Sequence, residues 1–271
     1  MLARGVIFSD LDGTFLDDAY TPVLAGADAR REFARWHVVW VSSRTADEVY
    51  HLQQSLGHTG DAVGENGGVL ILRDRAIAAA LGAPEPFRDA WIVTRASPHA
   101  ETLQLVRRAF ASAGVTPQIV DDLTPDELAR LSGYAKPDAE RALRRRTTVL
   151  IRHDTDSRFT AALDNLSKAG ASVAHGGRWI SIVLGADKGS AVRAWLDAQR
   201  EPFRIVAGIG NADNDESLLR AVGLPFVVRD AHHGYAASLA GIAGARLLQR
   251  HGTQGWLEML EQLDSLAGAD T

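Results

Sequence analysis

Short apolar runs alternate with amphipathic stretches over the first part of the chain. Residues 5–9 are apolar and β-branched, which is typical of a buried strand, and turn-forming residues follow them. The apolar spacing over residues 25–36 predicts a helix, and residues 38–41 predict a second buried strand. Thr45 and Glu48 form a capping-box pattern that predicts the start of the next helix. Strands that alternate with helices predict a parallel sheet with right-handed crossovers.

The alternation breaks near residues 82–86, where Gly and Pro predict a linker, and resumes after Lys188. The pattern therefore predicts an α/β fold: a Rossmann-like parallel-sheet core over residues 1–83 and 187–271, with an inserted α+β cap domain over residues 84–186. The predicted strands of the insert cover residues 91–93, 149–151 and 179–184, and its predicted helices cover residues 100–112, 125–131, 137–145 and 158–168. In the core, further strands are predicted over residues 62–63, 69–72, 205–207 and 226–228, and a helix over residues 188–199.

Composition narrows the possible classes of protein. The chain of 271 residues has no cysteine, which excludes a disulfide scaffold, thiolate-bound zinc, iron–sulfur clusters and a cysteine nucleophile. Its net charge of -5 argues against nucleic-acid binding, for which a basic excess is usual. No apolar run approaches the ~20 residues that span a bilayer. The strand-like run at residues 5–9 leaves no room for a signal peptide. These features favour a cytoplasmic protein without nucleic-acid or membrane partners.

Asp10 and Asp12 are the first candidates for chemistry. Alternate residues of an extended segment point to the same side, so both carboxylates lie together. Two close carboxylates repel unless a cation lies between them, and Mg²⁺ prefers oxygen ligands. A carboxylate also attacks phosphorus to form an aspartyl phosphate. The alternative is structural, since Asp-Gly pairs are common in turns.

Three other loops add groups that suit an anion and a metal ion. Ser42 follows a predicted strand, and Lys188 stands at a predicted helix start. The structural alternative for Ser42 is a serine that caps a helix start, and for Lys188 it is a lysine on the surface. The loop over residues 208–215 holds more carboxylate and amide oxygens than a turn needs. A calcium loop of the EF-hand type is the rival, but its final glutamate is missing. Ligand sites gather at the carboxyl ends of parallel strands, so we expect these loops to meet.

These four loops resemble the four motifs of the haloacid dehalogenase superfamily of aspartyl phosphatases. Asp10-Leu11-Asp12-Gly13-Thr14 matches the first motif, Ser42 the second, Lys188-Gly189 the third, and Asn214-Asp215 the core of the fourth. The position of the insert is similar to that of the large α/β cap found in sugar phosphatases of this superfamily. The resemblance implies a haloacid dehalogenase-like fold, Mg²⁺ as cofactor and phosphomonoester hydrolysis.

Within the superfamily, the chain looks most like the mannosyl-3-phosphoglycerate phosphatase family. The segments at residues 41–49, 64–68, 131–134, 175–179 and 185–189 carry this resemblance. It implies catalytic roles for Asp10, Asp12 and Lys188, and a metal site formed by Asp10, Asp12, Asn211 and Asp215. It also implies that the phosphate and the rest of the substrate contact Ser42, Ser43, Arg44, Asn66, Gly67, Gly177, Arg178 and Asn214.

The implied mechanism has two steps. Asp10 attacks phosphorus, while Asp12 protonates the leaving oxygen and then activates water to hydrolyse the aspartyl phosphate. Arg178 approaches the glycerate carboxylate of the substrate, since arginine binds carboxylates bidentately. The expected partner is a small phosphorylated sugar or a glycosyl phosphoglycerate, and the expected state is a monomer or weak homodimer. Two alternatives remain open: a phosphatase for sucrose phosphate, glucosyl-3-phosphoglycerate or another sugar phosphate, and a phosphate-binding relative without turnover.

The chain departs from the family pattern at two places. Asn211 stands where the family usually has aspartate, so one predicted metal ligand is neutral. Residues 144–148, Arg-Arg-Arg-Thr-Thr, replace an Arg-Glu-Tyr-(Ser/Asp)-Glu segment of the family cap. We expect weaker metal binding from the first departure and altered sugar recognition from the second.

Overall fold

The computed structural model describes residues 5–176, 179–230 and 232–268. Its contacts divide the chain into two units. The first unit holds residues 1–42, 52–62 and 188–271, and the second holds residues 43–51 and 63–187. The second unit ends at Asp187, one residue after the predicted end of the insert at residue 186. It also includes residues 43–51 and 63–83, which the sequence analysis assigned to the core. The assignment of residues 84–186 as a substrate-selecting cap stays a prediction.

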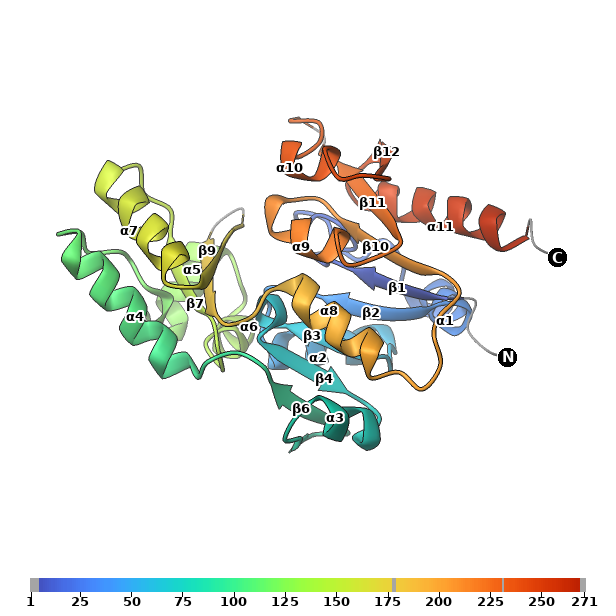
Figure 1. The fold of residues 1–271 in the computed structure, drawn as a ribbon, viewed down its shortest axis with the longest axis horizontal. Coiled ribbons are helices and arrows are strands. Elements are labelled where there is room, and N and C mark those ends of the chain that lie inside the picture. Colours follow the sequence, from blue (N-terminus) through green and yellow to red (C-terminus); the bar gives the residue numbers. More distant parts are fainter. Residues whose placement is uncertain (1–4, 177–178, 231, 269–271) are drawn as a thin grey trace. The chain divides into compact units, whose positions relative to one another are not determined.

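Parallel strands form the sheet of the first unit (Figure 1). Their order is β12-β11-β10-β1-β2, and each neighbouring pair is parallel. The predicted parallel α/β core is therefore confirmed for this part of the chain. The strands are β1 (Val6–Ser9), β2 (His37–Val41), β10 (Val206–Gly210), β11 (Leu224–Arg229) and β12 (Arg246–His251).

Helices pack against both faces of this sheet because its strands are apolar on both sides. On the face that carries Phe8, Trp195 of α8 packs edge-on against the Phe8 ring. On the opposite face, Trp256 of α11 contacts Ser9. The helices are α1 (Gly26–Arg35), α8 (Lys188–Asp197), α9 (Glu216–Leu219), α10 (Ala237–Ala240) and α11 (Thr253–Gly268), with a 3₁₀ turn η3 (Asp213–Asp215); α2 (Ala46–Leu56) contributes residues to both units.

In the second unit, the strands that follow the turn η1 (Glu65–Gly67) are antiparallel. β6 (Ala90–Thr94) pairs with β4 (Val69–Leu72) and with β5 (Glu85–Phe87), and α3 (Arg75–Leu81) connects β4 to β5. One expectation was wrong here: the predicted linker over residues 82–86 partly forms β5. The short β3 (Ala62–Gly64) precedes the turn.

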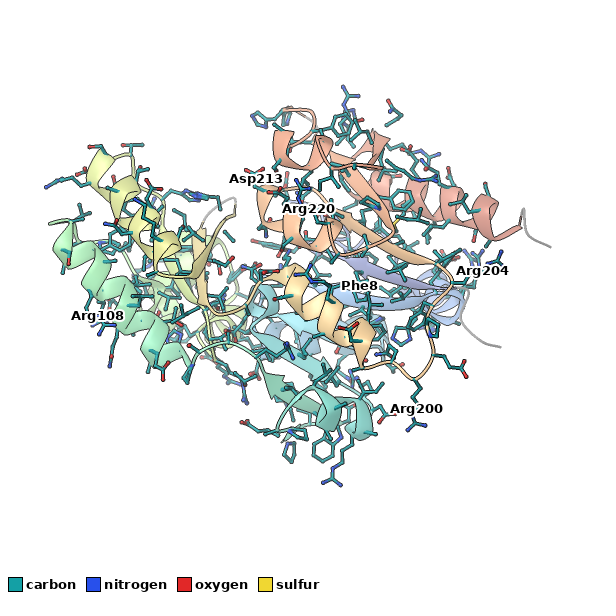
Figure 2. The ribbon with its side chains drawn as sticks, viewed as in Figure 1. Phe8, Arg108, Arg200, Arg204, Asp213 and Arg220 are labelled. Carbon is teal, nitrogen blue, oxygen red and sulfur yellow. The ribbon has the colours of Figure 1, made fainter. Side chains whose placement is uncertain are left out.

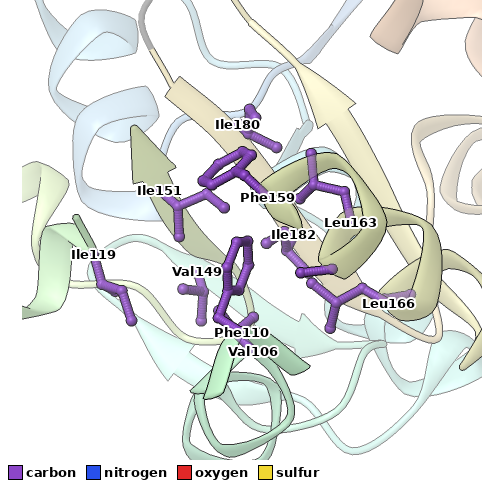
Figure 3. Close-up of a cluster of buried hydrophobic side chains, with 12 residues drawn as sticks. Val106, Phe110, Ile119, Val149, Ile151, Phe159, Leu163, Leu166, Ile180 and Ile182 are labelled. Atoms are coloured by element: carbon purple, nitrogen blue, oxygen red, sulfur yellow. The ribbon is translucent and has the colours of Figure 1, made fainter. Parts of the chain in front are cut away.

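A separate antiparallel sheet with the order β7-β9-β8 lies in the second unit. One of its faces packs against α4 and α7, and Figure 3 shows Phe110 and Phe159 of these helices beside Val149 and Ile182 of the sheet. Leu150 points to the other face, toward residues of α5 and α6. The elements are α4 (His99–Ser112), η2 (Val120–Asp122), α5 (Pro125–Ser132), α6 (Lys136–Ala142), β7 (Val149–Arg152), α7 (Ser157–Lys168), β8 (Ala171–His175) and β9 (Trp179–Leu184). The predicted mixture of helices and strands is confirmed. None of the helices described is long and apolar enough to cross a membrane.

Candidate active site

Three neighbouring parallel strands of the first unit end beside candidate residues. Asp10 follows β1, Ser42 follows β2 and Asn211 follows β10. β1 lies between β2 and β10, so the carboxyl ends of these strands meet at one edge of the sheet. The topology thus brings together three side chains that are far apart in the sequence, at the edge where α/β sheets bind ligands.

Lys188 links two of the acidic loops at this edge. Its Nζ donates hydrogen bonds to Asp10 Oδ1 at 2.7 Å and to Asp215 Oδ1 at 2.6 Å, and its side chain is 1% exposed. Burial alone lowers the pKa of Lys188, but attraction to Asp10 and Asp215 outweighs it and raises this pKa above its usual value. Lys188 is therefore a permanent cation between two carboxylates.

Asp10 lies in an environment that opposes its negative charge. Burial, followed by repulsion from Asp215, raises the pKa of Asp10 to about 7, although Lys188 partly offsets the rise. Its main-chain N–H donates to the Ile209 carbonyl oxygen at 3.0 Å, which fixes the residue to β10. A cation bound beside Asp10 would stabilise its charged form.

Asp215 is fully buried and uses both carboxylate oxygens within the protein. Oδ1 accepts from Lys188, while Oδ2 accepts from the N–H groups of Asn211 at 3.0 Å and Ala212 at 3.2 Å. A Cβ at Gly210 would lie 2.5 Å from Asp215 Cβ, so only glycine fits there. These contacts hold the loop after β10 in one shape.

Asn211 connects this loop to the loop after β1. Its Oδ1 accepts from Thr14 Oγ1 at 3.2 Å, and its Nδ2 lies so close to Gly13 that a Cβ there would approach it to 2.3 Å. Gly13 also has a φ of 80°, which favours glycine. The Asn211 side-chain oxygen therefore contacts the first motif, and its role as a metal ligand stays a prediction.

The remaining predicted residues of the first unit lie in the same two loops. Asp12 is half-buried and Asn214 is a half-buried residue of η3. Asp213, a further acidic residue of η3, is exposed (Figure 2). Its Oδ1 accepts from Ser238 Oγ at 2.5 Å. That contact directs Asp213 toward α10.

The donor chemistry of this edge suits Mg²⁺. Asp10, Asp12 and Asn211 supply hard oxygen donors, which Mg²⁺ prefers. Burial, followed by repulsion from Asp215, raises the pKa of Asp10, so a bound cation would stabilise its charged form. Over the described ranges, no group of three or more His, Asp or Glu side chains is arranged to hold a metal ion. A site here would therefore depend on the Asn211 amide and on main-chain oxygens as well as on carboxylates.

Four predicted substrate-binding residues lie in the second unit, around the turn η1. The N–H of Glu65 donates to the Arg44 carbonyl oxygen at 2.9 Å, and Arg145 Nη1 donates to the Ser43 carbonyl oxygen at 3.1 Å. Asn66 is 2% exposed, has a left-handed φ of 52°, and its side-chain amide has no hydrogen-bond partner among the described residues. Gly67 follows with a φ of 101°. A strained residue that carries an unpaired buried amide is a frequent feature of binding sites.

Glu65, which the sequence analysis did not select, organises this region. Its fully buried carboxylate accepts five hydrogen bonds of 2.8–3.0 Å from three consecutive residues. The donors are the N–H groups of Arg146, Thr147 and Thr148 and the hydroxyls of Thr147 and Thr148. A lone glutamate beside a glycine-rich turn gave no signal for this role, because its partners come about 80 residues later. Gly177 and Arg178 lie outside the described residues.

The chain is similar to known proteins whose names describe phosphatases or hydrolases. No known family model matches the chain. A glucosyl-3-phosphoglycerate/mannosyl-3-phosphoglycerate phosphatase from Methanococcoides burtonii is 24% identical over 245 residues, which cover 87% of this chain and 89% of the relative. A haloacid dehalogenase-like hydrolase from B. subtilis has a similar structure, with a TM-score of 0.64 and 14% identity over 95% of this chain and 98% of its own.

A sugar phosphatase of haloacid dehalogenase subclass IIB also has a similar structure. Its TM-score is 0.60 at 12% identity, over 90% of this chain and 93% of its own. The fold is haloacid dehalogenase-like, as the sequence predicted, and the resemblance to phosphatases of that superfamily is confirmed.

Proposed function

We propose that this protein is a phosphomonoester hydrolase that acts through an aspartyl phosphate on Asp10. A general phosphatase function is supported by the resemblance to superfamily phosphatases. The observation that carries the proposal is the Lys188 ammonium, buried between Asp10 and Asp215 at the carboxyl edge of the sheet. A buried cation beside a carboxylate nucleophile suits the binding of a phosphoryl group.

In the proposed mechanism, Asp10 attacks phosphorus in line and the bond to the sugar oxygen breaks. Asp12 donates a proton to that leaving oxygen and later removes a proton from the water that hydrolyses the aspartyl phosphate. Lys188 and Ser42 stabilise the phosphoryl oxygens. Asp215 orients Lys188 and, through two main-chain N–H groups, the loop that carries Asn211.

Mg²⁺ is the proposed cofactor, and it would neutralise phosphoryl charge when bound. Asp10, the Asp12 carbonyl and Asn211 would hold it. Asp215 would support the metal site indirectly, because both of its carboxylate oxygens already accept hydrogen bonds within the protein.

For the substrate, we propose a glycosyl phosphoglycerate, with mannosyl-3-phosphoglycerate first. The support is the resemblance at residues 64–68, 175–179 and 185–189, together with the activity in the name of the M. burtonii relative. Because that name also contains glucosyl-3-phosphoglycerate, we propose this compound as the second candidate substrate. Other hexose phosphates form a third, supported by the likeness to a sugar phosphatase. We propose that residues 84–186 determine which substrate binds, and that Gly177 and Arg178 contact that substrate. We further propose a cytoplasmic monomer or weak homodimer.

A phosphate-release screen tests this proposal. The purified protein is assayed with Mg²⁺ against mannosyl- and glucosyl-3-phosphoglycerate, sucrose phosphate, hexose phosphates and a generic aryl phosphate. We expect turnover of the aryl phosphate and the highest kcat/KM on a glycosyl phosphoglycerate. Preference for a simple hexose phosphate would overturn the substrate assignment. No turnover of any compound would instead favour the alternative of a phosphate-binding protein.

A further inference from the structure

Ser9 is a polar residue at the end of the apolar strand β1, and it is fully buried. A buried hydroxyl without partners costs free energy, so its contacts are informative. Its Oγ lies 2.7 Å from the carbonyl oxygen of Asp10 and 3.0 Å from Nε1 of Trp256, a residue of α11. The hydroxyl therefore joins the C-terminal helix to the main chain of the proposed nucleophile.

The direction of these two hydrogen bonds is fixed by chemistry. The indole N–H only donates and a carbonyl oxygen only accepts. The Ser9 hydroxyl therefore accepts from Trp256 and uses its own hydrogen to donate to Asp10. Loss of the indole N–H would free Ser9 Oγ to rotate away from Asp10.

Trp256 also holds the other end of the first motif. Its ring packs edge-on against Phe15, with ring centroids 5.2 Å apart and an interplanar angle of 77°. Phe15 directly follows the segment Asp10–Thr14, whereas Ser9 directly precedes it. One fully buried side chain thus contacts the residues on both sides of the motif.

The hydroxyl completes the fixation of Asp10. The N–H of Asp10 is bonded to Ile209, its carboxylate is bonded to Lys188, and its carbonyl is bonded to Ser9. In-line attack needs the reacting atoms within a narrow range, and a displacement of ~1 Å can cost about 100-fold in rate. The orientation of this peptide group is therefore relevant to the chemical step.

We propose that Trp256 and Ser9 form a positioning relay, which holds the Asp10 peptide group for in-line attack on phosphorus. The inference rests on the proposed function, in which Asp10 is the nucleophile. Ser9 and Trp256 are positioning residues that act through Asp10, and neither contacts the substrate in this scheme.

The test measures kcat and KM for a generic aryl phosphate with Mg²⁺ in Trp256→Phe, Ser9→Ala and the double variant. Phenylalanine keeps an aromatic ring against Phe15 and removes the N–H. We expect Trp256→Phe to lower kcat by roughly 3- to 10-fold, with KM changed less than about twofold, because positioning affects the attack and not binding. The double variant should be no slower than Ser9→Ala, because Trp256 acts through Ser9. Ser9→Thr retains a hydroxyl and should restore most of kcat.

Trp195→Phe is the matched control. Trp195 is equally buried, donates from Nε1 to Asp61 at 2.8 Å and packs edge-on against Phe8, but it does not bond to the first motif. It should lower the melting temperature while leaving kcat unchanged. Equal losses of kcat in both tryptophan variants, or a normal kcat in Trp256→Phe, would overturn the relay. If Trp256→Phe does not fold, the contrast between Ser9→Ala and Ser9→Thr decides. Absence of turnover by the wild type would refute the proposed function itself.

Discussion

The Asp10 carboxylate combines deep burial, a close negative neighbour and a lysine partner. Replacing it by asparagine keeps the shape of the side chain and removes the proposed nucleophile. We expect Asp10→Asn to retain the fold and to lose at least about 1,000-fold in kcat, since loss of a nucleophile is among the largest single effects known in enzymes. Phosphate release measures the loss, and circular dichroism verifies the fold. Activity within tenfold of wild type would contradict the assignment.

Asn211 presents a neutral oxygen to the first motif. In Asn211→Asp, a charged oxygen would replace it, and Mg²⁺ binds carboxylates more strongly than amides. We expect the Mg²⁺ concentration for half-maximal activity to fall by roughly 5- to 30-fold, on the order of 1–2 kcal/mol of added charge interaction. Asp213→Asn is the control, because Asp213 is bonded to Ser238, and it should leave the Mg²⁺ titration unchanged. If Asp213→Asn changes the Mg²⁺ titration and Asn211→Asp does not, the metal ligand is Asp213.

At this scale, sequence reasoning placed Asp10, Ser42 and Lys188 correctly at one edge, because each stands at the end of a recognisable element. It missed Glu65 and Ser9. Both act through partners that are distant in sequence. Ser9 belongs to no motif, and Glu65 lies in the segment over residues 64–68, where only Asn66 and Gly67 were given a role. Their roles depend on burial and hydrogen bonding, which only the folded chain reveals.

Among the elements, the turn η1 depends on one buried carboxylate. Five donors from residues 146–148 converge on Glu65. In Glu65→Gln, an NH₂ group would face some of these donors, and the charge that strengthens the hydrogen bonds would be lost. We expect a decrease of about 2–4 kcal/mol in the free energy of unfolding, measured by urea denaturation. Glu101→Gln, at an exposed position of α4, should change it by less than about 0.5 kcal/mol.

The start of α4 contains a pH-sensitive contact. His99 Nδ1 lies 2.8 Å from the Thr148 carbonyl oxygen, and His99 Nε2 contacts the Asp121 carboxylate. Only a doubly protonated ring donates to both acceptors, and the hydrogen bond to Asp121 raises the pKa of His99 above its ordinary 6.5. The stabilisation is complete below pH 6.5 and is lost as the pH rises through the raised pKa.

We therefore expect the melting temperature of the wild type to fall above about pH 6.5 more steeply than that of His99→Gln. The check is a series of melting curves from pH 5 to 9. Asp121→Asn should return the pKa of His99 toward its ordinary value, which titration of the imidazole by NMR would measure. Parallel pH profiles for wild type and His99→Gln would show that this contact does not contribute.

Helices and strands with a strong local sequence signal were predicted more accurately than those without one. The capping box at Thr45 and Glu48 is present, with both reciprocal hydrogen bonds at the start of α2. By contrast, Pro86 in the sequence predicts a linker where the structure has β5, because proline is tolerated in a short edge strand. The predicted helix over residues 137–145 ends at Ala142, because the main chain of residues 146–148 is bonded to Glu65.

Substrate choice is a property of the whole molecule, and substitution of Arg178 tests the proposed preference for a glycosyl phosphoglycerate. The glycerate carboxylate distinguishes a glycosyl phosphoglycerate from a simple sugar phosphate. If Arg178 binds that group, Arg178→Ala should lower kcat/KM for mannosyl-3-phosphoglycerate by roughly 30-fold or more, from a cost of about 2–5 kcal/mol for a lost charged pair. Turnover of a small aryl phosphate, which lacks the carboxylate, should change less than about twofold. Equal losses on both substrates would instead indicate a structural role.

The parallel neighbours of β1 are synthesised at very different times. β2 begins at His37, whereas β10 begins at Val206. A ribosome that adds about 5–20 residues per second needs roughly 8–34 s to translate from the start of β2 to the start of β10. During that interval, an apolar strand has one edge of unpaired N–H and C=O groups, which favours association with other chains. The yield of folded protein in a cell therefore depends on what shields this edge until β10 emerges, and slower translation of the second half should lower it.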